Sequence, residues 1–348
     1  MTTIFRPASL LRLCALMLAI STMMFTAGCS TFYTKAYKIT GNQVFRFGEK
    51  EMVPYLLAYD DTNMACAAGV ALTPLLMSFE AVGADPNQLA IMVYTAAGLC
   101  AENEGLNQEL RYLRAAQQQN IPEAQDARIA QKRWHGLAAA RQYIGYQRFV
   151  AHYGEMPKGR CPKNLDSDFD QLMYLVGILA GVQAVLNDSM SEQSVGVPRD
   201  IAAKVERMAV CVNSAKWWGL PQGLRAALWS IMPMLAPEGA KPRETLAQVA
   251  KQGERSGVRL GHAIWALVAV GDGDKELTKN IIRDFASAGR TAKLDPNFKM
   301  LDAMAAQMIL AVSDRLWTEA TGTRTPMGGL GTFWDDKPKS AGNIDDLL

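Results

Sequence analysis

Apolar side chains recur along most of the chain at the three- and four-residue spacing that marks one face of an α-helix. The spacing is clearest in four segments, residues 201–212, 224–235, 277–285 and 301–316. The alternation of β-branched and polar residues that is typical of strands is nearly absent between residues 50 and 320. This range therefore predicts an all-α domain.

Glycine, proline and acidic residues interrupt the apolar pattern repeatedly. The predicted breaks are residues 83–86, 153–166, 187–198, 219–221, 233–242, 271–273 and 293–296. The helices between them are mostly about 12 to 25 residues long, as in proteins built from helical hairpins. We expect stacked antiparallel helical hairpins, arranged as a tetratricopeptide-like solenoid or an irregular helical bundle. No linker divides the range, which favours one domain.

One predicted helix, residues 172–186, is apolar on all sides, with Gln183 as its only strongly polar side chain. It is too short to cross a bilayer comfortably, so we expect it at the centre of the domain. Gly177 and Gly181 lie four residues apart and would let another helix approach closely.

The N-terminus has the three parts of a secretory signal. Arg6 and Arg12 precede an uncharged apolar run, residues 13–25, and small residues at 26–28 lead into Cys29. The Ala-Gly-Cys sequence in this position resembles the lipobox of bacterial lipoproteins, although Thr26 occupies the place where leucine is usual. We predict a lipoprotein signal peptide over residues 1–28. The alternative is an ordinary signal peptide followed by a chance cysteine.

The lipobox resemblance implies that Cys29 becomes the acylated N-terminus of the mature chain. More than one acyl chain makes residence in a membrane stable. Ser30 follows, and in the enteric sorting pattern that this resembles an aspartate there would retain the protein at the inner membrane. We therefore expect a lipid-anchored, periplasm-facing protein of the outer membrane, with residues 29–49 as a tether in which residues 37–47 have some β character.

Charge gives no sign of a strongly charged partner. The 348-residue chain is 49% hydrophobic and 20% charged, with a formal net charge of +2. Loss of Arg6 and Arg12 with the signal reduces the 36 basic residues to 34, which equals the number of acidic residues. A neutral domain has no field that would attract nucleic acid, so nucleic-acid binding is excluded from our expectations.

Four cysteines other than Cys14 of the signal and Cys29 would reach the oxidising periplasm, where disulfides form. Residues 59–82 and 88–103 both have helical patterns, with a turn between them. In such an antiparallel hairpin two of these cysteines lie at the same height, and the other two pair by exclusion. The predicted bonds are Cys66–Cys100 and Cys161–Cys211. The alternative is four buried free cysteines.

Motifs for catalysis or metal binding are not recognisable. The chain has no HExxH, GxSxG, Walker or GxGxxG sequence, and its three histidines are far apart. Asp166, Asp168 and Asp170 alternate like the start of a calcium loop, but Gln171 and Gly177 occupy positions that need glycine and glutamate. We therefore predict no catalytic residues, no metal and no cofactor. We expect Asp166, Ser167 or Asp168 to cap the helix that follows this break, and Asp274 to cap a later helix.

Trp217 and Trp218 are the candidate ligand-binding residues. Adjacent indoles on a helix point about 100° apart, so both can rarely be buried in one core. We expect one of them to line a groove or a cavity, while ordinary core and edge packing is the alternative.

The C-terminal segment, residues 321–348, is glycine-rich at its start. We expect residues 317–336 to be non-helical and, because Phe333 and Trp334 supply aromatic anchors, to pack back on the helices or to dock a partner. Residues 337–348 are expected to be a disordered tail.

A lipoprotein signal followed by an alanine-rich helical array resembles the periplasmic T-component lipoproteins associated with TRAP transporters. Two turns carry the resemblance, Ala-Asp-Pro-Asn at residues 84–87 and Leu-Asp-Pro-Asn at residues 294–297. Such turns also resemble those of tetratricopeptide-like repeats. The resemblance covers about residues 50–320 as an architecture. It implies an accessory protein that binds a small apolar or amphipathic ligand between helices and contacts a periplasmic binding protein or an envelope transporter.

We therefore expect a non-enzymatic ligand- or partner-binding accessory of an envelope transport system. The alternative is a structural or assembly lipoprotein of an envelope complex, such as a secretion or pilus apparatus, because concave helical arrays also hold peptide segments. A hydrolase with an unrecognised acid–base pair is the third hypothesis.

Overall fold

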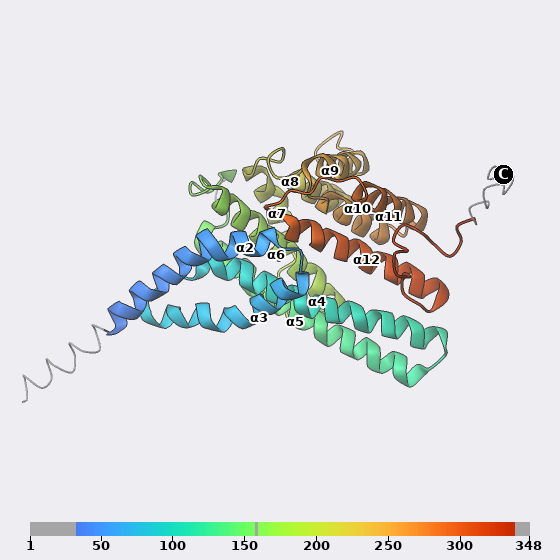
Figure 1. Cartoon of the computed structure of the whole chain (residues 1–348), viewed down its shortest axis with the longest axis horizontal. Coiled ribbons are helices and arrows are strands. Elements are labelled where there is room, and N and C mark those ends of the chain that lie inside the picture. The colour runs from blue at the N-terminus through green and yellow to red at the C-terminus, as the bar shows by residue number, and fades with distance from the viewer. Residues whose placement is uncertain (1–32, 157–158, 338–348) are drawn as a thin grey trace, which may run out of the picture.

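The computed structural model describes residues 33–156 and 159–337. Across these residues every regular element is a helix and no strand is present, which confirms the all-α prediction. Figure 1 shows the helices packed against one another, with the two ends of the described chain on opposite sides of the molecule. A tetratricopeptide-like solenoid stays a prediction.

The expected β character of residues 37–47 is wrong. Residues 33–47 form a helix that continues through a π-helical turn, Gly48–Met52, into α2, Val53–Ala58. Tertiary packing overrides the local preference, because Gly41 lets the helix lie against the Phe79 ring, which a Cβ at this glycine would meet at 2.8 Å. The rings of Phe45 and Phe79 also meet edge to face, with 5.9 Å between their centroids.

Helix α3, Thr62–Ser78, begins where the Asp61 carboxylate accepts hydrogen bonds from two backbone N–H groups. It ends in a short 3₁₀ turn, Phe79–Val82, and Gly83 then takes a left-handed conformation, with φ of 77°. These elements confirm the turn predicted at residues 83–86.

Two long antiparallel helices follow, α4 (Asn87–Gln117) and α5 (Ile121–Tyr153). The Asn120 side chain accepts a hydrogen bond from the Glu123 backbone N–H and caps α5. The pair forms a hairpin that projects at one end of the molecule, with the end of the last helix beside its tip (Figure 1). At a rise of 1.5 Å per residue, each helix is roughly 45–50 Å long.

Helix α6, Asp168–Met190, packs against α4, α5 and α7, which confirms the central helix predicted from its apolar composition. The Ser167 hydroxyl caps it by accepting a hydrogen bond from the Asp170 backbone N–H at 3.0 Å. Gly177 lies against the Phe149 side chain of α5, and Gly181 lies against Tyr146 of the same helix. The two glycines therefore permit the close helix approach that their spacing predicts.

Shorter helices form the C-terminal half of the chain. They are α7 (Ile201–Met208), α8 (Leu220–Ile231), α9 (Pro242–Ser256), α10 (Leu260–Gly271), α11 (Lys275–Gly289) and α12 (Lys299–Thr321), with 3₁₀ turns at Ala209–Cys211 and Pro233–Leu235. The Asp274 carboxylate caps α11, as predicted.

A buried ion pair joins the loop before α10 to α12. The Arg259 guanidinium donates to the Asp302 carboxylate, with 2.6 Å between Nη2 and Oδ2. This pair fixes the start of α10 against α12.

The C-terminal segment packs back on the helices, as predicted. Phe333 is buried, the Trp334 ring stacks edge to face on Trp317 at 5.6 Å, and the Lys279 ammonium binds the Asp335 carboxylate at 2.6 Å. The expected start of the non-helical segment is wrong, because α12 continues to Thr321 before Gly322 ends it in a left-handed conformation.

Candidate functional site

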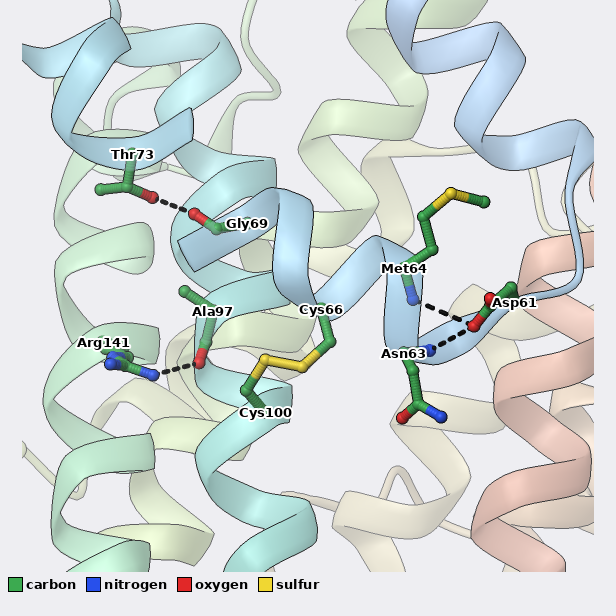
Figure 2. Close-up of a disulfide and its surroundings, with 9 residues drawn as sticks. All are labelled: Asp61, Asn63, Met64, Cys66, Gly69, Thr73, Ala97, Cys100 and Arg141. Carbon is green, nitrogen blue, oxygen red and sulfur yellow. Dashed lines mark hydrogen bonds between the residues drawn. A yellow bond between two sulfur atoms is a disulfide. The ribbon is translucent and has the colours of Figure 1, made fainter. Parts of the chain in front are cut away.

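Both predicted disulfides are present. Cys66 of α3 is bonded to Cys100 of α4, with 5.3 Å between their Cα atoms, and Cys161 is bonded to Cys211, with 5.4 Å. Figure 2 shows the first bond bridging two neighbouring helices, beside the capped start of α3. The second bond joins the loop between α5 and α6 to the 3₁₀ turn after α7. All four cysteines therefore serve as covalent links between helices or loops.

The expectation that Trp217 and Trp218 cannot both be buried is wrong. Their exposed fractions are 3% and 4%, and their rings meet edge to face at 5.3 Å. Both rings also contact Phe298, and the Trp217 Nε1–H donates to the Gln171 Oε1 atom at 3.0 Å.

A turn explains why both indoles fit one core. Trp218 and Gly219 both have positive φ, 55° and 80°, so the chain is not helical between the two tryptophans and α8. The 100° separation of adjacent helical side chains therefore does not apply. In this conformation the two rings are packed among core side chains, and a role in binding a ligand stays a prediction.

Cys29, the signal peptide and the tail after residue 337 lie outside the described residues. Their predicted roles therefore stay predictions. The described chain begins at residue 33, four residues after Cys29, within the helix over residues 33–47.

An open apolar depression of about 540 Å³ lies at the tip of the α4–α5 hairpin. Its lining includes Tyr112, Ile121 and Ile129, together with the cations Arg128 and Lys132. The Arg128 guanidinium lies over the Tyr112 ring, 5.4 Å from its centroid. A large aromatic ring, an arginine and exposed aliphatic side chains are a composition typical of protein-binding surfaces. We call this surface, with its ten lining residues between positions 112 and 132, the hairpin tip.

The turn at the hairpin tip is firmly held on one side. The Arg111 guanidinium on α4 binds the carboxylates of Glu123 and Asp126 on α5, with 2.9 Å between its Nη2 atom and the Asp126 Oδ2 atom. The Gln118–Asn120 turn therefore connects two helices whose ends are cross-linked by ion pairs.

A chain of polar side chains crosses the buried interface of α4, α5 and α6. The His135 Nδ1 atom lies 2.6 Å from the Asn187 Oδ1 atom, and Asn187 donates to the Gln142 Oε1 atom at 2.9 Å. Gln142 in turn donates to the Glu102 carboxylate at 3.1 Å. Because Asn187 uses its amide N–H₂ on Gln142, its oxygen accepts from His135, which carries its proton on Nδ1. The hydrogen bonds therefore run in one direction, from His135 to Glu102.

Burial raises the pKa of the Glu102 carboxyl, and the hydrogen bond from Gln142 and the nearby His135 only partly oppose this effect. Two amide groups separate Glu102 from His135. Amide N–H groups do not release protons near neutral pH, so the chain joins three helices without providing a route for proton transfer. Its chemistry suits fixing the register of α4, α5 and α6.

Two features of the site were not predicted, and the sequence carries only a partial signal for one of them. Asn187 ends an otherwise apolar helix, and Gln142 lies among the small residues Ala138, Ala139 and Gly145, which marks buried polar groups needing partners. The turn at residues 118–120, which forms the hairpin tip, is not among the predicted breaks. The Gln117 side chain beside this turn donates to the backbone carbonyls of Thr318 and Glu319, so the end of α12 lies next to the hairpin tip.

Within the described residues, no group of three or more histidine, cysteine, aspartate or glutamate side chains is placed to hold a metal ion. Comparison of the chain with protein-family models, curated proteins and solved structures found no match.

Proposed function

We propose that this chain is a lipid-anchored accessory protein of an envelope transport system, and that it acts by binding a partner. In this proposal acyl chains on Cys29 hold it at the outer membrane, facing the periplasm, and the hairpin tip binds a periplasmic binding protein or an envelope transporter. The proposal extends the resemblance to T-component lipoproteins and assigns no bond-making or bond-breaking step to the chain.

The observation that carries the proposal is the separation of the two ends of the molecule. The helix over residues 33–47, which begins four residues after Cys29, projects at one end, and the α4–α5 hairpin projects at the other (Figure 1). A protein held at the membrane through its first end presents the hairpin tip away from the anchor. This arrangement suits a partner that approaches from the periplasm.

The surface of the hairpin tip supports a protein as the bound partner. Ile121 and Ile129 have exposed fractions of 64% and 48%, and burying such side chains is the main source of affinity in an interface. The Arg128–Tyr112 pair supplies the residue types that most often dominate binding energy. A depression that is open to solvent accepts a protruding side chain more readily than it encloses a small ligand.

Two variants test the proposal in cells. Cys29→Ser should move the protein from the membrane fraction to the soluble periplasm, because it removes the site of acylation. Ile129→Glu should leave the protein in membranes but abolish its chemical cross-linking to the partner, since it puts a charge into the apolar depression. Leu267→Glu on α10 is the matched control, because Leu267 is similarly exposed and lies outside the hairpin tip.

A wild-type mature chain whose mass shows no acyl chains on Cys29 would refute the lipid anchor. Equal cross-linking of wild-type protein, Ile129→Glu and Leu267→Glu would refute the hairpin tip as the binding surface.

A structural or assembly lipoprotein of an envelope complex is the second candidate, and the burial of Trp217 and Trp218 supports it over ligand carriage. Native mass spectrometry of the protein purified from the periplasm separates these hypotheses. A co-purifying small hydrophobic molecule supports ligand carriage, whereas a stoichiometric envelope protein supports partner binding. A partner that belongs to a secretion or pilus apparatus supports the assembly role.

A further inference from the structure

Helix α3 exposes an apolar face along its whole length. The residues at this face are spaced three and four apart and are Ala67, Val70, Ala71, Pro74, Leu75, Ser78 and Ala81. Val70 and Leu75 are its largest members, with exposed fractions of 42% and 53%. We call these seven residues the α3 face. Normal amphipathic packing puts apolar residues inside and polar ones outside, and here the outside is apolar as well.

The 17 residues of α3 include no charged side chain. The mean hydropathy of Thr62–Val82 is 1.6, the same as for α6. Of the most apolar stretch of each segment, however, 11% is buried inside the protein for Thr62–Val82 and 50% for α6. By length and composition alone both helices could cross a membrane. Core position accounts for the apolar composition of α6, but it does not account for that of α3.

Two polar side chains of α3 bond back to the backbone of the helix. The Ser78 hydroxyl donates to the Leu75 carbonyl at 2.7 Å, and the Thr73 hydroxyl donates to the Gly69 carbonyl at 2.6 Å (Figure 2). Such bonds remove the need for water at these groups, as in helices that contact lipid. Pro74 has no N–H, so the Val70 carbonyl lacks its usual helical donor, and this carbonyl needs water or a lipid headgroup nearby.

Helix α3 is fixed against the protein and is not free to insert across a bilayer. The Cys66–Cys100 disulfide ties it to α4, and Gly69 lies so close to α4 that a Cβ there would be 2.6 Å from the Ala97 nitrogen. Helix α4 carries several charged residues after Cys100. The α3 face can therefore enter a membrane only from the side, with the helix lying along the surface.

The N-terminal chain brings this face close to the predicted anchor. The end of α3 lies beside the helix over residues 33–47, since Phe79 packs on Gly41. Four residues from Cys29 to Tyr33 reach about 14 Å at most, and the helix adds about 12 Å to residue 41. Acyl chains on Cys29 would thus hold the end of α3 within about 26 Å of the membrane surface.

The same helix has the composition of a membrane-interface segment. Tyr37 and Phe47 are exposed aromatic residues, and Lys35 and Lys38 are exposed cations close to the anchor. Tyrosine and lysine are favoured at the boundary between lipid and water, and lysine is attracted to anionic headgroups. At the end of the α3 face, the negative charge of Glu80 is paired with Arg148 at 2.8 Å.

We infer that the α3 face is a membrane-binding surface that lies in the lipid–water interface, so that the protein is held flat against the bilayer as well as tethered to it. The inference rests on the proposed lipid anchor for the choice of a bilayer as occupant. The aliphatic composition of the face agrees with this choice, since protein-binding hot spots are enriched in tryptophan, tyrosine and arginine.

The test uses the mature chain with Cys29→Ser, which cannot be acylated, so that vesicle binding reports the protein surface without the anchor and the substitutions at α3 report the α3 face. Its partition onto vesicles of phosphatidylethanolamine and phosphatidylglycerol is measured by flotation. We expect binding that Leu75→Glu and Val70→Glu each weaken by about tenfold or more, because each replaces a buried apolar contact with a charge. Leu267→Glu, an equally non-conservative change at a residue exposed by 44%, should bind like the parent protein.

Absence of vesicle binding by the parent protein would overturn the inference, as would equal binding by Leu75→Glu and Leu267→Glu. Self-association of the parent protein that Leu75→Glu abolishes, without vesicle binding, would assign the face to a second copy of the chain instead. Circular dichroism and disulfide content show that each variant is folded. Because the α3 face alone can hold unacylated protein at a membrane, the anchor is tested separately, by the mass of the acyl chains on Cys29 of the wild-type protein.

Discussion

Replacing Gly177 by alanine should destabilise the protein even though alanine is the better helix former. On helix propensity alone the change would stabilise α6 by about 1 kcal/mol. The added Cβ, however, would lie 2.3 Å from the Phe149 Cδ2 atom and 2.7 Å from its Cβ atom, where carbon atoms prefer about 3.5–4 Å. The ring or the helix must therefore move by more than 1 Å.

Phe149 has little room to move. Its ring is fully buried and packs against Tyr146, Tyr153 and Tyr174, with centroid distances of 5.7, 5.6 and 5.1 Å. Overpacking in such a core costs about 1–3 kcal/mol, which exceeds or cancels the gain in propensity. We expect Gly177→Ala to lower the free energy of unfolding by up to about 2 kcal/mol.

The matched control is Gly271→Ala at the end of α10, where an added Cβ has nothing within 4 Å. This change should be neutral or stabilise the protein by up to about 1 kcal/mol. Equilibrium unfolding in guanidinium chloride, with both disulfides intact and an unchanged denaturant slope, gives the two differences. Phe149→Leu in the Gly177→Ala background should recover part of the loss. If Gly177→Ala were as stable as Gly271→Ala, the close approach of α5 and α6 described above would be wrong.

Two predictions concern pH. Burial, and to a smaller extent the charge of Arg259, lower the pKa of His262 to about 4. Between about pH 6.5 and 4 the unfolded chain therefore binds a proton that the native chain does not, and the free energy of unfolding should fall by up to about 3 kcal/mol as the pH is lowered through this range. His262→Gln should remove this part of the pH dependence in denaturant titrations, and an unchanged pH dependence would contradict the assignment. Burial raises the pKa of Glu102, so the native chain holds this proton more tightly than the unfolded chain, and stability is lost as pH rises through the native pKa. Glu102→Gln should therefore be more stable than the wild-type protein at neutral pH but not at acid pH, and a lower stability at both would show that Gln142 requires a carboxylate.

The sequence pattern predicted the features that depend on local periodicity and on helical height. The apolar run of α6 indicated a core helix because it has no polar face. Gly177 and Gly181 indicated close helix packing because residues four apart lie on the same side of a helix. The Cys66–Cys100 bond followed from the turn at residues 83–86, because residues equally distant from a turn meet in an antiparallel hairpin. Helix type and the pairing of neighbours are fixed by this kind of information.

The incorrect predictions concern segments whose conformation depends on distant contacts. Residues 37–47 have a weak local preference, and packing against Phe79 selects a helix. The burial of Trp217 and Trp218 depends on the positive φ of Trp218, a conformation uncommon for such a large residue and therefore not expected from the sequence. The hydrogen bonds from His135 to Glu102 link three helices. Their residues are up to 85 positions apart in the sequence, and no local pattern indicates that they come into contact.

The packing of the α4–α5 hairpin on α3 has a consequence for how a partner is found. A chain fixed to a bilayer searches in two dimensions, and with the α3 face on the lipid, the packing of α4 along α3 holds the hairpin tip at a set height close to the membrane surface. Any partner embedded in the same membrane, with its docking site at that height, meets the tip at a high effective concentration, so modest intrinsic affinity suffices for occupancy. Proteins free in the periplasm gain no such advantage. The hairpin would therefore select partners by height above the membrane as well as by surface chemistry.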